Sequence, residues 1–522
     1  MAALASAGCG GSSTNTASSA VGKASFYTGW TLGGAPVHGG TATVDTPEAP
    51  PTFDPFHGTT GASGLSVQRQ VYDQLFEMMP ASGSRTILEP ALASSWTVSP
   101  DQLTYTFNIR HGVYFSNGER LTGEDVVFSL KRGQSPLDAA YAFTKPWKQI
   151  SLTSPMTVRL QLSKPEPALL EYLNYLQLSI VPKRVYEREG GKAFGLHPVG
   201  TGPFMIESAT AGFSSITMVR NPHYWRAGKP YLNKLVFNVV ESDNARILAV
   251  RSGAATIAQA IPYAQAASLR HTSGVKMEIG PEWGASYNVF NRAKAPLDEA
   301  NVRRALMYAT PREEIIKAVY KGLGTPANSL WGQVKYYNTK VPLYPYDLKK
   351  AKELLKSSSV PNGFDITINV SSGETQGELL ASILQSSWAQ IGVHASIRDI
   401  PTTTLTTNFF TGKYEFTIFP PEDGWDELYA PDGIVFYFDD TEPGFSPPAS
   451  AKVVSELKQA VTSPGEDERR RLFESIQYET YWQEAFFMPI VNLVSLNLIS
   501  DSLHGFQVLS TTDTHMEEMW LQ

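Results

Sequence analysis

Apolar and polar residues alternate along four short segments of this chain, and such alternation is typical of strands with one buried face. These segments are Gly39–Asp45, Leu103–Arg110, Val393–Arg398 and Tyr414–Phe419. The first leads into a proline-rich turn, as expected of a strand at the edge of a sheet. The last two follow predicted helices, so they indicate an α/β unit with some parallel strand pairing.

Three other segments carry the spacing of helices. Residues 66–78 have an apolar residue at every fourth position, and residues 379–391 present one apolar face that stops at Gly392. Residues 463–484 open with serine, proline and glutamate in the order of a helix start. The apolar positions of the first two helices are Val67, Val71, Leu75, Leu379, Leu380, Ile383, Leu384, Trp388 and Ile391.

Length and charge narrow the class of protein. A chain of 522 residues with 42% hydrophobic residues is too long for one ordinary core, so we expect two or three packed units. The formal net charge of -7 disfavours nucleic acid and anionic membrane surfaces as partners, because both attract an excess of lysine and arginine. No window approaches the roughly 20 apolar residues of a membrane helix. A binding partner that is uncharged or of mixed charge fits this composition better.

Motifs of enzyme chemistry are missing from the sequence. It has no H-E-x-x-H, no G-x-S-x-G and no phosphate-binding loop that ends in Gly-Lys-Ser or Gly-Lys-Thr. The segment Gly322–Ala327 fits a weak dinucleotide fingerprint, but it follows a helical stretch and contains Pro326, so a helix-ending turn is expected. The nine histidines never lie three or four residues apart. We therefore expect no enzyme activity, no metal site and no cofactor.

The single cysteine, Cys9, excludes an internal disulfide and draws attention to the N-terminus. The stretch Ala7–Cys9, followed by glycine and serine, resembles the end of a bacterial lipoprotein signal, in which the cysteine carries the lipid. No basic or full apolar region precedes it, and a start codon farther upstream would explain this. The alternative is a disordered N-terminus with an incidental cysteine.

Segments along the whole chain resemble one family of receptors. Leu88–Asp101 and Tyr105–Val126 look like the signature of the family 5 solute-binding proteins, which are peptide- and nickel-binding receptors of ABC importers. The resemblance continues in the same order through Gly200–Phe204, Arg220–Trp225, Pro296–Leu297, Val302–Leu306, Ile391–Val393 and Phe487–Pro489. Gly200 and Gly202 also suit a tight turn with a close backbone approach.

This resemblance implies an α/β fold of two lobes, of the type II periplasmic-binding-protein-like class, with an extra subdomain inserted in lobe I. The solute would lie between the lobes and be covered when they close about a hinge. The implied division is a signal remnant and tether at 1–36, lobe I at 37–75, 197–282 and 490–522, the inserted subdomain at 76–196, and lobe II at 283–489.

The resemblance also implies three ligand-facing segments, around the turn at 57–60, the crossover at 282–287 and the loop at 423–429. In peptide-binding relatives the third segment carries an aspartate that pairs with the peptide's amino terminus. This chain has Leu428 at that position, so Asp426 or Glu427 would have to replace it. The predicted ligand-binding residues are Thr59, Thr60, Trp283, Ser286, Tyr287, Trp425, Asp426, Glu427, Leu428 and Tyr429.

The expected function is therefore capture of a short peptide or a solute of similar size, and its delivery to the ABC permease. Without an amine-pairing carboxylate, an oligosaccharide, an opine or a metal chelate is the alternative ligand. Two other classes stay open from the sequence, a cell-wall regulatory lipoprotein that has lost transport and a secreted hydrolase. We expect a monomer, held by its lipid at the extracellular face of a bacterial membrane or located in the periplasm.

Overall fold

The computed structural model describes most of the chain in atomic detail. The described residues are 34–57, 62–80, 86–136, 138, 140–330, 335–420, 438, 447–509 and 514–522, with the backbone alone at 62, 63, 142, 282 and 283. Within these ranges, no helix is long and apolar enough to cross a membrane.

A seven-stranded sheet forms the first large layer of the fold. Its strands, in spatial order, are β12 (Val275–Ala285), β17 (Asn492–Ser500), β11 (Ile257–Ala258), β1 (Thr41–Thr46), β10 (Lys234–Val239), β9 (Ser215–Arg220) and β8 (Phe204–Ala209). β1 runs parallel to both of its neighbours, β10 and β11, and the other pairs are antiparallel. The strand predicted in Gly39–Asp45 is therefore confirmed as β1, although it lies in the interior of the sheet instead of at its edge.

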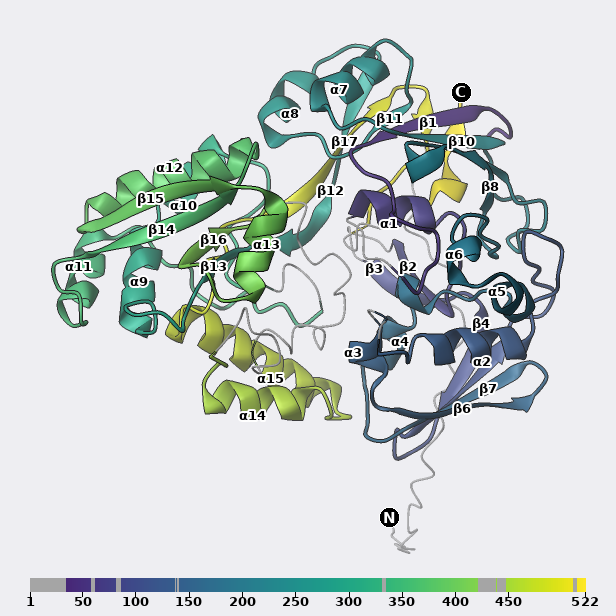
Figure 1. The fold of residues 1–522 in the computed structure, drawn as a ribbon, viewed down its shortest axis with the longest axis horizontal. Coiled ribbons are helices and arrows are strands. Elements are labelled where there is room, and N and C mark those ends of the chain that lie inside the picture. Colours follow the sequence, from purple (N-terminus) through teal and green to yellow (C-terminus); the bar gives the residue numbers. More distant parts are fainter. Residues whose placement is uncertain are drawn as a thin grey trace, which may run out of the picture.

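A second, four-stranded sheet lies on the opposite side of the β12–β17 pair from β1 and β10 (Figure 1). Its order is β13 (Asn288–Phe290), β16 (Phe416–Ile418), β14 (Phe364–Ser371) and β15 (Val393–Ile400). β14 is parallel to both β15 and β16, so the predicted parallel pairing is confirmed.

Helix α12 (Thr375–Ala389) covers this second sheet and was predicted from its apolar face. Leu380, Leu384 and Trp388 are fully buried, and Gly392 ends the connection to β15 with φ +84°. Leu379 was expected on the same face, but its side chain is 41% exposed. Adjacent residues of a helix point about 100° apart, so Leu379 cannot share the direction of Leu380.

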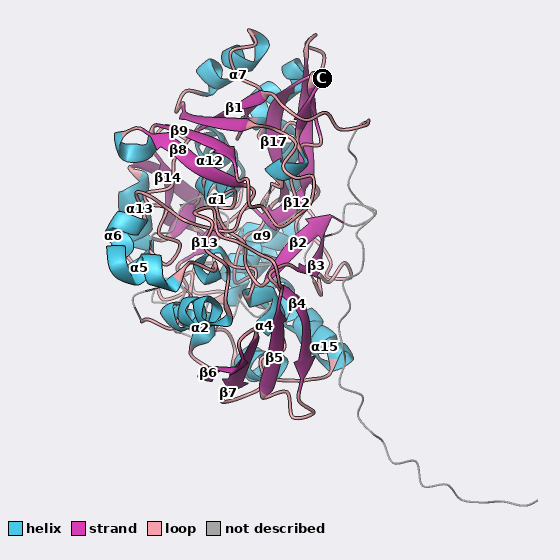
Figure 2. Cartoon of the chain, turned by 90° about the vertical axis from the view of Figure 1, so that its right-hand side faces the viewer, coloured by secondary structure: helices cyan, strands magenta, loops and turns pink. Residues whose placement is uncertain are grey.

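A four-stranded antiparallel sheet stands at the end of the molecule away from β1 and β17, as Figure 2 shows. Its order is β4 (Ala93–Val98), β5 (Thr104–Ile109), β7 (Thr157–Leu162) and β6 (Trp147–Ser154). β5 confirms the predicted alternation, because Tyr105, Phe107 and Ile109 point into the core. Helix α2 (Gly123–Arg132) packs on β6 and β7 and begins with a capping box between Thr122 and Asp125.

The prediction of one helix over residues 66–78 is wrong beyond Gln68, which is less than one turn into the predicted range. Helix α1 spans Ala62–Gln68, and β2 (Phe76–Pro80) instead pairs with β3 (Thr86–Pro90). The carbonyl oxygens of Gln70 and Val71 accept hydrogen bonds from the amides of Phe204 and Gly202, both at 2.9 Å. The regular apolar spacing reflects burial on several sides, and this long-range pairing overrides the helical signal.

Glycine is required at residues 200 and 202, where the chain pairs with Gln70 and Val71, and the close backbone approach predicted for these two glycines is confirmed. A Cβ atom on Gly200 would lie 2.0 Å from the carbonyl oxygen of Val71, and one on Gly202 would lie 2.5 Å from the carbonyl carbon of Val71. Both contacts are with backbone, which cannot turn aside as a side chain can. The turn therefore fastens the chain near residue 71 to the start of β8.

Shorter elements complete the described parts of the fold. The helix predicted from residue 463 is confirmed as α15 (Glu466–Gln477), but its start is not, because Gly465 is the cap in place of Ser463 and the helix begins at Glu466. A π-helical turn, Tyr478–Gln483, follows it directly. The remaining helices and strands are α3 (Tyr141–Thr144), α4 (Leu169–Tyr172), α5 (Lys183–Glu189), α6 (Gly191–Phe194), α7 (Asp243–Arg251), α8 (Tyr263–Leu269), α9 (Ala300–Tyr308), α10 (Arg312–Ala318), α11 (Leu348–Lys356), α13 (Thr402–Phe410), α14 (Ala451–Ala460), α15 (Glu466–Gln477), β18 (Leu503–His504) and β19 (Trp520–Leu521), with 3₁₀ turns at Leu176–Leu178, Ala211–Phe213 and Met516–Glu518.

Candidate functional site

Strands β12 and β17 connect the two bodies of the molecule. They pair antiparallel from Val275 opposite Ser500 to Ala285 opposite Asn492, with register shifts around Glu282. β12 lies at the edge of the seven-stranded sheet, and β13 of the second sheet begins three residues after β12 ends. In Figure 1 the second body, with α9 to α15, therefore lies to one side of this pair, and the body with β1 to β10 lies to the other.

Two of the predicted ligand-binding residues, Ser286 and Tyr287, lie in the described part of the crossover segment at 282–287, and both are buried. The Ser286 hydroxyl oxygen accepts hydrogen bonds from the amides of Ile490 at 2.9 Å and Val491 at 3.2 Å. The Tyr287 ring packs against Phe419, with 5.1 Å between ring centroids, and against Phe487. These contacts hold the segments around 286, 419 and 490 together. A role of Ser286 and Tyr287 at the ligand stays a prediction.

The other predicted residues lie at or beyond the border of the described chain. Trp283 belongs to β12, but its side chain is outside the described part. The residues wholly outside it are Cys9, Thr59, Thr60, Trp425, Asp426, Glu427, Leu428 and Tyr429.

The described chain next to these segments is firmly attached on both sides. His57, the first residue of the predicted turn, contacts the Asp54 carboxylate through Nδ1 at 2.8 Å, and the same carboxylate accepts a hydrogen bond from the Tyr186 hydroxyl at 2.8 Å. On the other body, the amide of Phe419 donates to the carbonyl of Tyr287 at 3.0 Å. The two unplaced segments therefore start from fixed points on opposite bodies.

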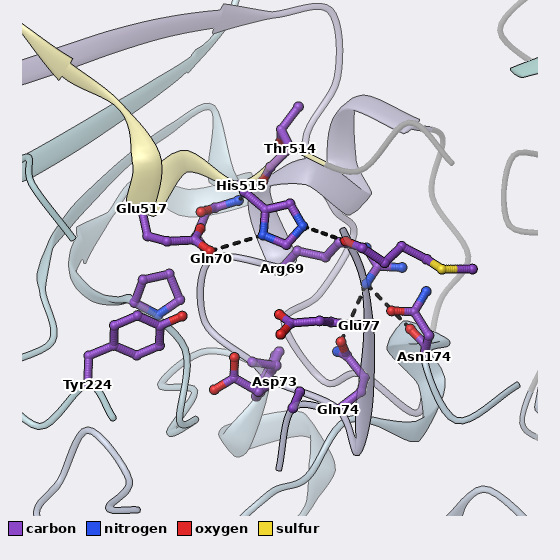
Figure 3. A pocket seen from close by; sticks show the side chains of 14 residues that line it. Arg69, Gln70, Asp73, Gln74, Glu77, Asn174, Tyr224, Thr514, His515 and Glu517 are labelled. Atoms are coloured by element: carbon purple, nitrogen blue, oxygen red, sulfur yellow. Dashed lines mark hydrogen bonds and ion pairs between the residues drawn. The ribbon is translucent and has the colours of Figure 1, made fainter. Parts of the chain in front are cut away.

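A small polar pocket lies within the first body and is drawn in Figure 3. It has about 40 Å³ of space, enough for a few water molecules and far too little for a peptide-sized ligand. Its walls come mainly from the segment between α1 and β2, from β2 itself and from the C-terminal segment. They include Arg69, Gln70, Asp73, Gln74, Glu77, Asn174, Tyr224, Thr514, His515 and Glu517.

Arg226 is the centre of the charged cluster beside this pocket. Its guanidinium pairs with Glu77 of β2, and with the Glu517 carboxylate at 3.3 Å. It also stacks on the Trp225 ring, 4.7 Å from the ring centroid. The Trp225 indole N–H donates to the Asp73 carboxylate at 3.0 Å. Arg226 thus ties β2 and the segment around 225 to the C-terminus.

His515 and Glu517 form a second ion pair in the same cluster, 3.0 Å apart (Figure 3). The Nε2–H of His515 donates to the carbonyl of Met78 at 2.7 Å. Burial alone would lower the pKa of His515, but the Glu517 carboxylate outweighs it and raises this pKa to about 9. Burial likewise opposes ionisation of Glu517, yet His515 and Arg226 lower the pKa of Glu517 to about 2. Both groups therefore carry charge at neutral pH.

Burial also raises the pKa of the two other carboxyl groups, Asp73 and Glu77, and there the nearby Arg226 does not outweigh it, so both pKa values stay above their ordinary value. No local sequence pattern predicts this cluster, because its members come from residues 73–77, 225–226 and 515–517. Within the described ranges, no group of histidine, cysteine, aspartate or glutamate has the arrangement of a metal site. The cluster joins three distant segments of the first body.

Two α/β bodies connected by paired crossing strands define a class, the two-lobed binding proteins with a periplasmic-binding-protein-like fold. More closely, the chain belongs to family 5 of the bacterial extracellular solute-binding proteins, because the model for the middle region of that family matches residues 88–443. The family and fold predicted from the sequence are thereby confirmed. The protein is the substrate-binding component of an ABC importer and not an enzyme.

Similar proteins extend the match over nearly the whole chain. The glutathione-binding protein GsiB of Escherichia coli O1:K1 is 28% identical over 484 residues, which cover 90% of this chain and 92% of that protein. The structure of the ABC transporter-associated periplasmic binding protein DppA from Helicobacter pylori, in complex with the peptide STSA, is 26% identical with a TM-score of 0.79 and covers 93% of this chain and 98% of its own. The binding protein CtaP from Listeria monocytogenes has a TM-score of 0.81 at 25% identity, covering 93% and 99%.

Proposed function

We propose that this receptor captures a short peptide, in the size range between glutathione and a tetrapeptide, and delivers it to the permease of its importer. The observation that carries this proposal is the similarity to the glutathione-binding protein GsiB, which extends over 90% of this chain. The similarity to H. pylori DppA, whose structure contains the peptide STSA, supports the same class of ligand.

The proposed ligand site lies between the two bodies. Of the proposed ligand-binding residues, Thr59 and Thr60 belong to lobe I in the division proposed below, and Trp425 and Tyr429 belong to lobe II. Trp283 and Trp425 supply flat apolar surface. Asp426 or Glu427 pairs with the peptide's ammonium and so replaces the aspartate that peptide-binding relatives have at the position of Leu428. Bending of β12 and β17 closes the lobes over the peptide.

The proposed lobes follow the division expected from the sequence. Lobe I consists of 37–75, 197–282 and 490–522, the inserted subdomain of 76–196, and lobe II of 283–489. Membership of the sheets supports these limits, since β8 to β12 and β17 share one sheet with β1, whereas β13 to β16 form another. We further propose a monomer, anchored through lipid on Cys9 at the outer face of the membrane or free in the periplasm.

Replacement of Trp425 by alanine is expected to weaken binding of glutathione or of the peptide STSA by about tenfold or more, because the proposed aromatic contact with the ligand is lost. The dissociation constant is measured by titration calorimetry for the wild type and this variant. Tyr346→Ala serves as the matched control, because Tyr346 is an aromatic residue outside the proposed site and is 48% exposed. An equal affinity of wild type and Trp425→Ala would refute the proposed contact.

The proposed role of the two acids is tested with the same titration. Asp426→Asn or Glu427→Gln, whichever removes the amine partner, is expected to reduce affinity for STSA and to leave affinity for N-acetylated STSA unchanged. Equal affinity of the wild type for both forms of the peptide would contradict recognition of the ammonium.

A further inference from the structure

Lys335 forms an ion pair between the two bodies at a point remote from their covalent connection. Its ammonium lies 3.3 Å from a carboxylate oxygen of Glu171 and 3.6 Å from one of Glu466. Glu171 belongs to α4 of the first body, and Glu466 begins α15 of the second. In Figure 1, α4 and α15 approach each other below the centre, whereas β12 and β17 cross above it.

The second body positions Lys335 in a compact charged group at the start of α15. The Tyr336 ring stacks on Phe473, with an interplanar angle of 12°, and its hydroxyl donates to Glu466 at 2.7 Å. The guanidinium of Arg470 lies 5.2 Å from the centroid of the same ring. The Lys335 ammonium lies 5.1 Å from the centroid of this ring, so Lys335 is held against its own body while it reaches Glu171 of α4.

The first body presents acidic groups at the matching position. Glu166 and Glu171 lie close enough to Tyr105 that, after burial, their charges are the main cause of a tyrosine pKa raised to about 12. Arg469 of α15 acts on the same hydroxyl in the opposite direction. Acidic groups on one body thus face basic groups on the other across the contact, which is the arrangement of a complementary interface.

Partial burial gives this ion pair more weight than an ordinary surface pair. The side chain of Glu171 is 12% exposed, and that of Lys335 is 29% exposed. Burial tends to lower the pKa of Lys335, but Glu171, Tyr336 and Glu466 outweigh it and raise this pKa, so the ammonium stays charged. The ion pair of Lys335 with Glu171 therefore joins the two bodies through partly buried side chains.

We propose that Glu171 and Lys335 form an ionic latch that favours the closed arrangement of the lobes. The pair is made when the bodies are together and lost when they separate, so it contributes free energy to one state and not to the other. The latch sets how much of the receptor is closed before any solute binds. This inference rests on the proposed closure of the lobes about β12 and β17.

The test measures the distance between the bodies in the full chain. Spin labels are attached to cysteines at Leu152 and Leu379, both exposed and on different bodies, in a Cys9→Ser background, and the distance distribution is recorded by pulsed electron spin resonance. Without added solute, Lys335→Met and Glu171→Gln are each expected to lower the ratio of short to long distances by about two- to fivefold. The double variant should match the single variants, because the same pair is lost once.

Lys350→Met is the matched control, since Lys350 pairs with Glu353 at 3.6 Å within α11 alone. It should leave the distribution unchanged. Unaltered distances in both latch variants, additive shifts in the double variant, or an equal shift in the control would each overturn the latch. Addition of glutathione and STSA to the wild type separates the two proposals. If neither solute changes the distances, the proposed peptide ligand is contradicted. The latch is still tested by the difference between wild type and latch variants in solute-free samples.

Discussion

Replacing Arg226 with methionine is expected to lower the free energy of unfolding by about 3–5 kcal/mol. Arg226 lies between Glu77 and Glu517, whose side chains are 14% and 5% exposed. Without the guanidinium, both carboxylates remain buried in the same cluster with one cation fewer. The stacking on Trp225 is lost as well. Urea denaturation, followed by tryptophan fluorescence and circular dichroism, gives the free energy of unfolding of each variant.

Arg188→Met is the matched control, because Arg188 is 65% exposed and its pair with Glu189 lies at the surface. Its effect should stay within about 0.5 kcal/mol. If Arg226→Met proved as mild as this control, the charged cluster would not hold the three distant segments together as described.

Raising the pH from about 6 to about 9.5 is expected to remove roughly 2–3 kcal/mol of stability that depends on His515. Because the pKa of His515 is raised from 6.5 to about 9, its stabilising contribution is complete below pH 6.5 and disappears as the pH rises through 9. Deprotonation leaves Glu517 without this cationic partner. Urea denaturation at a series of pH values measures the effect.

Glu517 should govern the acid side of the same profile. Its pKa is lowered from 4.5 to about 2, so its contribution is present above pH 4.5 and is lost as the pH falls through 2. The raised pKa values of Asp73 and Glu77 act in the other sense, because their ionisation in a buried place makes the folded state less stable as the pH rises. We therefore expect the highest stability from this cluster on the acidic side of neutrality.

His515→Gln tests the alkaline limb specifically. Glutamine retains an N–H that can donate to the carbonyl of Met78 but has no ionisable proton. Its stability should change little between pH 6 and 9.5, unlike that of the wild type. His271→Gln, at an exposed position, should retain the wild-type profile. A decline of equal size in His515→Gln and wild type would contradict the assignment to His515.

Local sequence patterns correctly predicted the helices and strands that bury a single face against the core. The alternation around Phe107 identifies β5, and the face with Leu384 and Trp388 identifies α12. The pattern failed at Val71, where long-range pairing with Gly202 replaces the helix. There the backbone hydrogen bonds go to residues about 130 positions away, so the spacing of apolar residues near Val71 cannot predict them.

The candidate site was less accessible to sequence reasoning than the fold. Resemblance to the family indicates where Trp425 and Leu428 lie in the loop, but the direction of each side chain depends on how that loop packs. Ser286 illustrates the difficulty, since a hydroxyl expected at the ligand also satisfies the amides of Ile490 and Val491. The pair of Glu171 and Lys335 unites residues 164 positions apart, so it has no sequence signature at all.

Native mass spectrometry of the gently purified full chain tests the peptide ligand most directly, because tightly bound solutes remain in a closed site through purification. Our account predicts one additional mass per protein in the range of short peptides, replaced by the mass of STSA when that peptide is added in excess. Bound masses that step by one hexose, with no binding of STSA or glutathione, would contradict it.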